Sequence, residues 1–129
     1  PRSTLFPYTT LFRSVMRKVK VKICGLKRVQ DIECVNKLLP DYIGFVFAKT
    51  KREVTEQQAA QLKAMLNPQI KAVGVFVNAE IDLIARLAKS RTIDIIQLHG
   101  DEDAAYCERL RQQTELPIIY AQACSLYAD

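Results

Sequence analysis

Apolar segments that end in polar or reactive residues recur at nearly even spacing along the 129-residue chain. They read VKVKICGL, YIGFVFAKTKR, KAVGVFVN and DIIQLHGDE, and a fifth apolar segment begins at Pro117. Their starts at Val19, Tyr42, Lys71, Asp94 and Pro117 lie 23, 29, 23 and 23 residues apart. Each interval accommodates one strand, one amphipathic helix and two short loops, which together form the βα unit of a parallel sheet. We therefore expect an α/β fold.

Reactive side chains follow the apolar core of each expected strand. Cys24, Arg52, Asn78 and His99 come after the first four strands in turn. The carboxyl ends of parallel strands share one rim of the sheet, where such folds hold their active sites. The sequence thus predicts that these four residues gather at one rim.

The segments between the strands carry helical patterns. Thr55 is expected to cap the second helix, and Cys34 and Cys107 are interpreted as buried packing residues on the first and fourth helices. Asp101, Glu102 and Asp103 are interpreted as the acidic first turn of the fourth helix, where the helix dipole favours negative charge. The residues expected on the buried faces of the first three helices are Val29, Ile32, Val35, Leu38, Ala59, Leu62, Ala64, Met65, Ile81, Ile84, Ala85 and Ala88.

Residues 1–15 are interpreted as a non-native leader and are excluded from fold reasoning, because Thr4 to Ser14 resembles the translation of a sequencing adapter. The segment contains two arginines and no acidic residue, so setting it aside lowers the formal charge from +5 to +3. This surplus gives no support to a nucleic-acid surface. The alternative interpretation of the leader, a short secretory or transit segment, lacks the continuous apolar run of a signal peptide.

The four cysteines form no CxxC pair, and a single histidine offers no metal-ligand cluster. Together with the absence of a signal sequence, this pattern favours reduced thiols and a cytoplasmic location. No apolar stretch approaches the ~18 to 20 residues of a membrane span. We expect no metal, no cofactor, no nucleic-acid partner and no membrane partner.

Length and composition leave two architectures open. A closed barrel of eight βα units takes ~250 residues, and this chain supplies four units and a fifth strand. An open, doubly wound sheet of five strands would nearly fit the observed length.

The ends of the strands resemble those of the phosphoribosylanthranilate isomerase family, whose members are eight-stranded TIM barrels of tryptophan biosynthesis. The matching blocks occur in family order and at family spacing. They are KICGL (22–26), DYIGFVF (41–47), the Lys49-Thr50-Lys51-Arg52 loop, VGVFVN (73–78) and QLHGDE (97–102). Two departures, Thr50 and Glu53 in the second loop and Tyr120 at the end of the fifth strand, concern local substrate contacts.

The resemblance implies a partial TIM barrel over residues 16–129, the N-terminal part of one domain. It implies an Amadori rearrangement of N-(5-phosphoribosyl)anthranilate to 1-(2-carboxyphenylamino)-1-deoxyribulose 5-phosphate. The implied ligand is a small phosphosugar, and no cofactor is implied. The whole protein is expected to be a monomer or a homodimer, with fusion to a neighbouring tryptophan-pathway domain as an open possibility.

The reaction moves a proton from carbon 2 to carbon 1 of the sugar and needs both a base and an acid. By resemblance Cys24 is the base, whereas the residues alone favour a small buried thiol before a glycine turn. A thiol acts through its thiolate, which cations favour, and Lys22 and Arg52 are the candidates.

By resemblance Arg52 holds the anthranilate carboxylate, a task suited to a planar guanidinium. Its alternative is a solvated loop cation. His99 is assigned to substrate positioning, against a hydrogen-bonded histidine at the rim. Gln97 and Asn78 either bind substrate through their amides or orient neighbouring groups.

The family's general acid, an Asp at the end of the sixth strand, has no counterpart, since Asp129 follows too soon after Ala121. The sequence is therefore expected to be truncated at its C-terminus and inactive alone. Two alternatives stay open: another phosphosugar-binding TIM-barrel enzyme, and a non-catalytic half-barrel that binds a phosphorylated ligand or a protein.

Overall fold

The computed structural model describes residues 19–121, which form five strands that alternate with four helices. The expected leader at residues 1–15 lies outside the described residues, as do Cys124 and Asp129. The elements are β1 (Lys22–Cys24), α2 (Val29–Leu38), β2 (Tyr42–Val46), α3 (Glu56–Met65), β3 (Lys71–Phe76), α4 (Ile81–Lys89), β4 (Ile95–Leu98), α5 (Ala104–Gln113) and β5 (Ile118–Tyr120).

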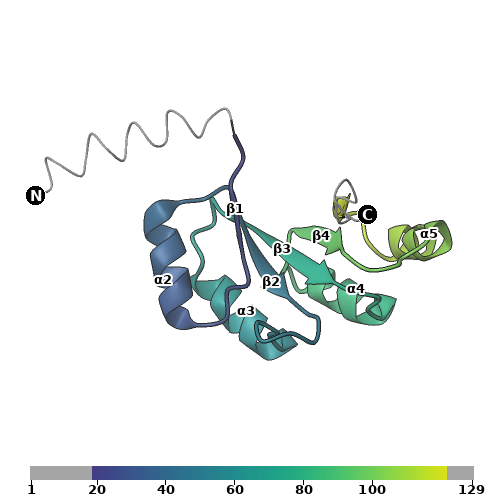
Figure 1. Cartoon of the computed structure of the whole chain (residues 1–129), viewed down its shortest axis with the longest axis horizontal. Coiled ribbons are helices and arrows are strands. Elements are labelled where there is room, and N and C mark those ends of the chain that lie inside the picture. Colours follow the sequence, from purple (N-terminus) through teal and green to yellow (C-terminus); the bar gives the residue numbers. More distant parts are fainter. Residues whose placement is uncertain (1–18, 122–129) are drawn as a thin grey trace, which may run out of the picture.

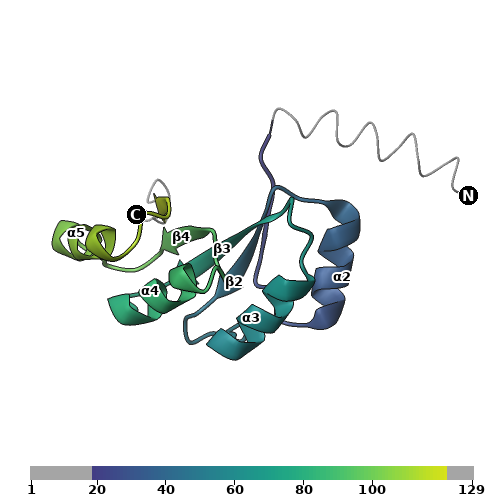
Figure 2. The same cartoon turned by 180° about the vertical axis from the view of Figure 1, so that it is seen from behind.

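All five strands are parallel, and their order in the sheet is β1-β2-β3-β4-β5. Connections between parallel strands are right-handed, so an order that always advances in one direction places every helix on the same face. Figures 1 and 2 show α2, α3, α4 and α5 following one another along one side of the sheet. A doubly wound sheet would reverse its order. The expected partial barrel is therefore confirmed.

The main apolar core lies between the sheet and helices α2 and α3. It is built from alternate strand residues, because side chains of a strand point to opposite faces in turn. Its fully buried members include Ile32, Val35, Ile43, Phe45, Ala59 and Ala72. Each large apolar side chain buried here stabilises the fold by about 1.5–3 kcal/mol. The residues between them in the strands, such as Gly44, point to the other face.

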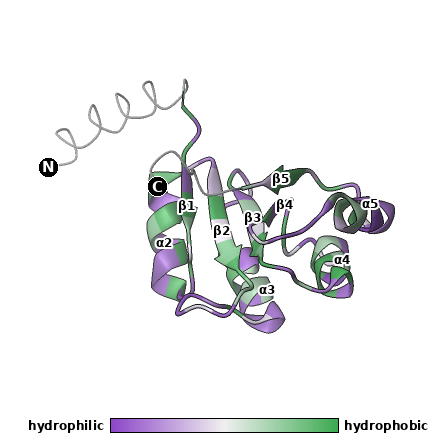
Figure 3. Ribbon diagram, turned by 45° about the vertical axis from the view of Figure 1, so that its right-hand side comes forward, coloured by the Kyte–Doolittle hydropathy of each residue, from purple (hydrophilic) through white to green (hydrophobic). Residues whose placement is uncertain are grey.

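A second apolar cluster lies under α4 and α5 and includes Phe76, Ile84, Leu98 and Leu110. Phe47 packs against both clusters, and its ring stacks on that of Phe76 with centroids 5.2 Å apart. The two clusters therefore form one continuous layer between sheet and helices. In Figure 3 the helices carry both hydrophobic and hydrophilic residues, as expected when only one side of each is covered.

Thr55 caps α3 as expected. Its hydroxyl accepts a hydrogen bond from the Gln58 N–H (3.1 Å), and the Gln58 side chain accepts one from the Thr55 N–H (2.9 Å). This reciprocal pair is a capping box, which satisfies two backbone donors at the start of the helix.

The expected buried face of α2 is wrong at both ends. Ile32 and Val35 are buried, but Val29 and Leu38 are 44% and 51% exposed. A helix turns about 100° per residue, so Val29 and Leu38 lie about 90° to either side of the buried pair. Cys34 on the same helix is exposed, which corrects its interpretation as a packing residue.

The predicted faces of α3 and α4 are correct in part, and so is the packing residue predicted for α5. In α3, Ala59 and Leu62 are buried, whereas Ala64 and Met65 are exposed. In α4, Ile84 is buried, and the equally buried Leu87 was not predicted. Cys107 in α5 is half-buried and packs against the second cluster, as its interpretation required.

Asp101, Glu102 and Asp103 do not form a first helical turn, because α5 begins at Ala104. Asp103 is the N-cap residue, and its carboxylate accepts a hydrogen bond from the Tyr106 N–H at 2.8 Å. Glu102 is buried at 4% exposure and bonds to two loops instead. None of the helices in residues 19–121 is both long enough and apolar enough to cross a membrane.

Candidate active site

The predicted site residues lie along the carboxyl rim of the sheet. Cys24 is the last residue of β1, and Arg52 lies in the loop between β2 and α3. Asn78 and His99 lie in the loops that follow β3 and β4, whereas Gln97 lies within β4. Two groups form at the rim, one around Cys24 and Arg52, and one around Asn78.

Cys24 points to the face of the sheet opposite the helices. It pairs with Gly44 in the register of β1 and β2, and both neighbours of Gly44 in β2, Ile43 and Phe45, belong to the helix-side core. Paired residues of parallel strands point to the same face. The half-buried thiol therefore lies on the inner face of the partial barrel, beside Gly44.

A tight turn after Cys24 brings Arg52 against it. Gly25 has φ +88°, a conformation that side chains disfavour, and a Cβ there would lie 2.4 Å from the Arg52 Cδ. The Arg52 Nη1 donates a long hydrogen bond to the Cys24 carbonyl (3.5 Å). Arg52 remains exposed, so its guanidinium is available to an incoming anion.

The loops around Arg52 are rich in cations. The Lys27 ammonium donates to the Lys51 carbonyl at 3.2 Å and joins the first two loops. Partial burial alone would raise the pKa of Asp31, but hydrogen bonds from the Lys27 N–H and from Arg28 outweigh it and lower that pKa. Asp31 thus stays ionised and is hydrogen-bonded to these neighbours.

Gln97 is occupied by Lys22, whose ammonium donates to the Gln97 amide oxygen across the inner face. Lys22 is level with Lys71 in the sheet register, whereas Gln97 pairs with Val75, four residues further along β3. In a flat sheet these two positions would lie nearly 20 Å apart. The contact therefore requires a curved sheet with the Lys22 side concave. Lys22 shares the Cys24 face, but its ammonium is bonded to Gln97.

Asn78 orders the rim between β3 and β4. It adopts a left-handed conformation with φ 50°, and its amide oxygen accepts a hydrogen bond from the Asp101 N–H (3.1 Å). Its own N–H donates to the Glu102 carboxylate at 2.7 Å. Asn78 is exposed, and the contacts that the structure gives it are with the neighbouring loop.

Glu102 is a functional candidate that the sequence did not single out. Its carboxylate accepts hydrogen bonds from the N–H groups of Asn78 (2.7 Å) and Gly100 (2.8 Å) and so links two loops of the rim. The Tyr120 hydroxyl donates to the Glu102 carbonyl at 2.7 Å, which adds the end of β5. The only signal in the sequence was a Glu two residues after a glycine at a strand end.

Tyr106 also fastens this part of the rim, through a 2.6 Å hydrogen bond from its hydroxyl to the Ala79 carbonyl. Burial, and then the negative charge of Glu102, raise the pKa of Tyr106 to about 12. The phenol therefore stays protonated over the physiological range and acts as a donor.

His99 follows β4 immediately, on the same loop as Gly100 and Glu102. Its N–H donates to the Phe76 carbonyl at 2.9 Å, which fixes its backbone, while its side chain is exposed. No hydrogen bond joins the imidazole to another of residues 19–121. It is therefore available to a ligand above the rim.

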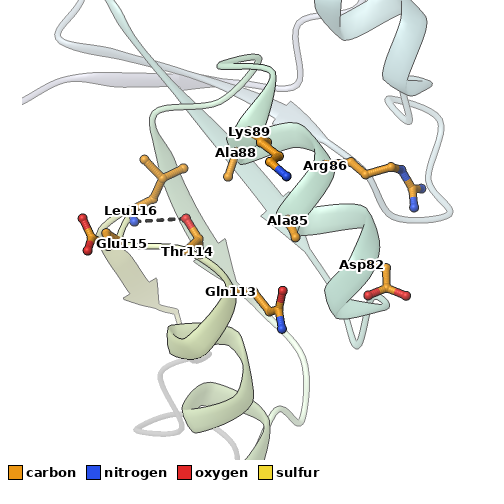
Figure 4. Close-up of a pocket in the computed structure, with 9 residues that line it drawn as sticks. All are labelled: Asp82, Ala85, Arg86, Ala88, Lys89, Gln113, Thr114, Glu115 and Leu116. Atoms are coloured by element: carbon orange, nitrogen blue, oxygen red, sulfur yellow. Dashed lines mark hydrogen bonds between the residues drawn. The ribbon is translucent and has the colours of Figure 1, made fainter.

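Two surface hollows among the described residues differ in their place, one away from the rim and one at it. One of about 570 Å³ separates α4 from the end of α5, and Figure 4 shows its lining, with the Leu116 N–H bonded to the Thr114 hydroxyl at 3.2 Å. Another, of about 780 Å³, lies between the loops after β2 and β3 and is lined by Lys49 and Asn78 among others. Neither includes Cys24, Arg52 or His99. Residues 19–121 also hold no cluster of His, Cys, Asp and Glu suited to a metal ion.

Residues 21–127 match the family described as N-(5'phosphoribosyl)anthranilate (PRA) isomerase. A relative of that name from Lachnoclostridium phytofermentans is 50% identical over 103 residues, which are 80% of this chain and 47% of the relative. The chain spans about half the length of the curated relatives it matches.

Two solved structures have the same arrangement of strands and helices. One is a phosphoribosyl anthranilate isomerase in complex with reduced 1-(o-carboxyphenylamino)-1-deoxyribulose 5-phosphate, with TM-score 0.69, 32% identity and coverage of 79% of this chain and 52% of that chain. The other is a monomer generated from the dimeric enzyme of Thermotoga maritima, with TM-score 0.69, 30% identity and coverage of 85% and 68%.

Proposed function

This chain belongs to the N-(5'-phosphoribosyl)anthranilate isomerase family of TIM-barrel proteins, and from that membership we propose that it supplies the base and the carboxylate site of this isomerase. The reaction is the Amadori rearrangement of N-(5-phosphoribosyl)anthranilate to 1-(2-carboxyphenylamino)-1-deoxyribulose 5-phosphate in tryptophan biosynthesis. The observation that carries the proposal is the contact of Arg52 with the Cys24-Gly25 turn at the carboxyl rim.

Cys24 is the general base in this proposal. Its thiolate removes the proton from carbon 2 of the opened sugar, and the electron pair of that C–H bond becomes part of the enolamine. The thiol then donates a proton to carbon 1, and the carbon 2 hydroxyl gives its proton to the conjugate base of the acid that opened the ring, which leaves the keto sugar. The position of the thiol on the concave face supports this role, because substrate in a barrel lies over the carboxyl ends of the strands. The acid that protonates the ring oxygen is not assigned to any described residue.

Arg52 binds the anthranilate carboxylate in this proposal. A guanidinium can make two parallel charge-assisted hydrogen bonds to a carboxylate, which sets the orientation of the aromatic ring. The exposure of Arg52 and the neighbouring Lys27 and Lys51 support the assignment. The complex of a related isomerase with a carboxyphenylamino sugar phosphate is consistent with such a site.

His99 positions the substrate above the rim, supported by its exposed imidazole. For Gln97 and Asn78 the contacts favour the orienting role over direct substrate binding. The amide oxygen of Gln97 accepts from Lys22, and that of Asn78 accepts from the Asp101 N–H. Both side chains retain amide N–H donors for a ligand.

Residues 16–129 are proposed to be the N-terminal part of a single barrel domain, and residues 1–15 a non-native leader. The proposed partner is the small phosphosugar alone, without cofactor, nucleic acid or membrane, in the cytoplasm. A homodimer is a possible assembly of the whole protein, supported by the dimeric Thermotoga maritima relative. Fusion to another tryptophan-pathway domain is the other possible arrangement.

A hybrid enzyme tests the function. Residues 19–121 replace the corresponding segment of the Lachnoclostridium phytofermentans relative, which supplies the remaining length. The hybrid is expected to convert phosphoribosylanthranilate and to restore growth of isomerase-deficient bacteria without tryptophan. Cys24→Ala should nearly abolish turnover, and wild-type turnover in that variant would refute the base assignment.

The carboxylate site is tested in the same hybrid with Arg52→Lys. Loss of the bidentate contact is expected to weaken transition-state binding by about 1.5–3 kcal/mol, which lowers kcat/KM roughly ten- to hundredfold. A substrate panel separates this function from other phosphosugar barrels, since only a substrate with an aromatic carboxylate should depend on Arg52. A folded hybrid that is indifferent to Arg52 would favour another phosphosugar enzyme.

A further inference from the structure

Gly44 is a glycine in the middle of a strand whose backbone does not require glycine. Among the described glycines only Gly25 has a positive φ, so an alanine could adopt the conformation of Gly44 without backbone strain. Glycine in a strand interior costs about 0.5–1 kcal/mol relative to alanine. A strand glycine of this kind often marks a place where another group approaches closely.

The group that approaches Gly44 is the thiol of Cys24. A Cβ on Gly44 would lie 2.6 Å from the Cys24 Sγ and 3.3 Å from its Cα and Cβ. The two residues are partners in the register of β1 and β2, so their side chains share the inner face. The sulfur therefore occupies the space that the side chain of any other residue at position 44 would fill.

We propose that Gly44 is a positioning residue that holds the Cys24 thiol over β2 by leaving this space open. The effect of Gly44 on catalysis rests on the proposed function, in which Cys24 is the base. The position of the sulfur is independent of that function. The backbone role of Gly44 is separate. Its carbonyl accepts from the N–H groups of Gly25 and Leu26 (3.0 and 3.2 Å), and any residue could supply that oxygen.

The substitution Gly44→Ala moves the sulfur in a defined direction. The thiol ends a side chain with one rotatable bond, so it shifts more easily than the paired backbones. Within residues 19–121, β1 pairs only with β2, and a sulfur pushed away from β2 turns toward the unpaired side of β1. There it is more accessible, and access raises the reaction rate of a thiolate.

Alkylation of Cys24 in the 129-residue chain measures this shift. Wild type and Gly44→Ala are treated with iodoacetamide in native buffer and in urea, and the modified Cys24 peptide is quantified by mass spectrometry. The native rate is expected to rise several-fold in Gly44→Ala, with equal rates for the two chains in urea. Equal native rates would overturn the proposal.

Gly74→Ala is the matched control. It makes the same change on the neighbouring strand, but its Cβ would meet Ile93 and the Phe76 ring at 2.9 Å, on the helix side. It is expected to lower the urea midpoint while leaving the native alkylation rate of Cys24 unchanged. An equal rise in Gly74→Ala would show that general loosening exposes the thiol, and would also overturn the proposal.

A double-mutant cycle gives a second, independent readout. Gly44→Ala should lower the urea midpoint less in a Cys24→Ala chain, because the sulfur it would displace is absent. Strictly additive midpoint changes would count against the proposal. In the hybrid enzyme, Gly44→Ala should lower kcat with little change in KM. A raised alkylation rate with unchanged kcat would support the placement of the sulfur and refute Cys24 as the base.

Discussion

At the scale of single residues, the least exposed charged group at the rim has the widest structural effect. Glu102 is 4% exposed, and its carboxylate accepts two backbone N–H groups from the loops after β3 and β4. Those loops carry Asn78 and His99. A buried carboxylate that accepts two hydrogen bonds therefore fixes the loop backbone that carries two exposed candidate residues, although its own side chain does not face the solvent.

Glu102→Gln is expected to destabilise the chain by about 1–3 kcal/mol, because the amide N–H₂ of Gln would face a backbone donor and leave it unpaired. Urea unfolding followed by circular dichroism measures the change. Glu108→Gln, on the exposed side of α5, makes the same substitution and should leave the midpoint unchanged. Similar midpoints for the two variants would contradict the role given to the buried hydrogen bonds.

Sequence reasoning correctly predicted the location of residues that follow directly from their position after a strand. Cys24 and Arg52 come after strands, and the parallel topology brings them together at the rim. Glu102 was misinterpreted because acidic residues before a helix resemble a charged first turn. An acidic side chain before a helix can point to solvent or back into the loops. Its direction depends on N–H groups of a loop distant in sequence, and for Glu102 the donor is the Asn78 N–H.

At the scale of elements, α3 is stabilised by local contacts at its start and by apolar contacts with the sheet. The capping box of α3 joins Thr55 and Gln58, and the apolar contacts come from Ala59 and Leu62. The cap could be predicted from sequence, because it depends on residues three positions apart. The faces of α2 were predicted less well, because spacing by threes departs from the 3.6-residue turn.

Thr55→Ala should destabilise the chain by about 1 kcal/mol, since the Gln58 N–H would lose its acceptor. Thermal or urea unfolding measures the loss. Gln57→Ala is the control, because Gln57 is exposed in the first turn of α3 and takes no part in the capping box. A loss of equal size in both variants would indicate that helix propensity, and not the cap, is responsible.

Helices α3 and α4 are joined by an ion pair with a defined pH dependence. The Arg86 guanidinium donates to the Glu56 carboxylate at 2.8 Å, and this hydrogen bond lowers the pKa of Glu56 below 4.5. A carboxyl with a lowered pKa in the folded state adds stability above its unfolded pKa and loses it as the pH falls through the folded value. The pair thus stabilises the chain at neutral pH and not in acid.

The stability difference between wild type and Glu56→Gln should therefore be present at about pH 6 and shrink as the pH falls through the lowered pKa of Glu56. Urea midpoints of the two chains, measured from about pH 6 downward, test whether this difference shrinks toward acid pH. Both side chains are largely exposed, so added salt should shrink the difference at pH 6. A difference that grows toward acid pH would show that Glu56 contributes in its protonated form.

At the scale of the whole molecule, the described strands form a curved parallel sheet covered by helices on one side. Regular spacing of strands predicted the βα units and their order, because each unit is a local feature of sequence. Composition could not distinguish a barrel from a doubly wound sheet. The difference between the two folds lies in which strands are neighbours. The motifs at the strand ends predicted the barrel, and the observed strand order agrees with it.

The sheet leaves apolar groups uncovered within residues 19–121. Ile119 on β5 is 44% exposed and shares the concave face with Gln97, while β5 pairs only with β4. Exposed strand edges and apolar faces promote association between copies. The 129-residue chain is expected to self-associate, with a sedimentation coefficient that rises with concentration.

Ile119→Lys should reduce that association without lowering the unfolding midpoint, because it places a charge on an edge strand. Gln112→Lys adds the same charge to the exposed surface of α5 and should have little effect. Sedimentation velocity over a range of concentrations compares the three chains. A strictly monomeric wild type would contradict this account of the concave face.

The pairing of Cys24 with Gly44 also constrains how the family can vary in length. One residue inserted before Ile43 would move the Ile43 side chain into the place of Gly44, against the sulfur, and Gly44 into the core position of Phe45. A single insertion would thus disturb the Cys24 thiol and the core together. Insertions and deletions that accumulate over evolution should therefore be confined to the loops and excluded from β2.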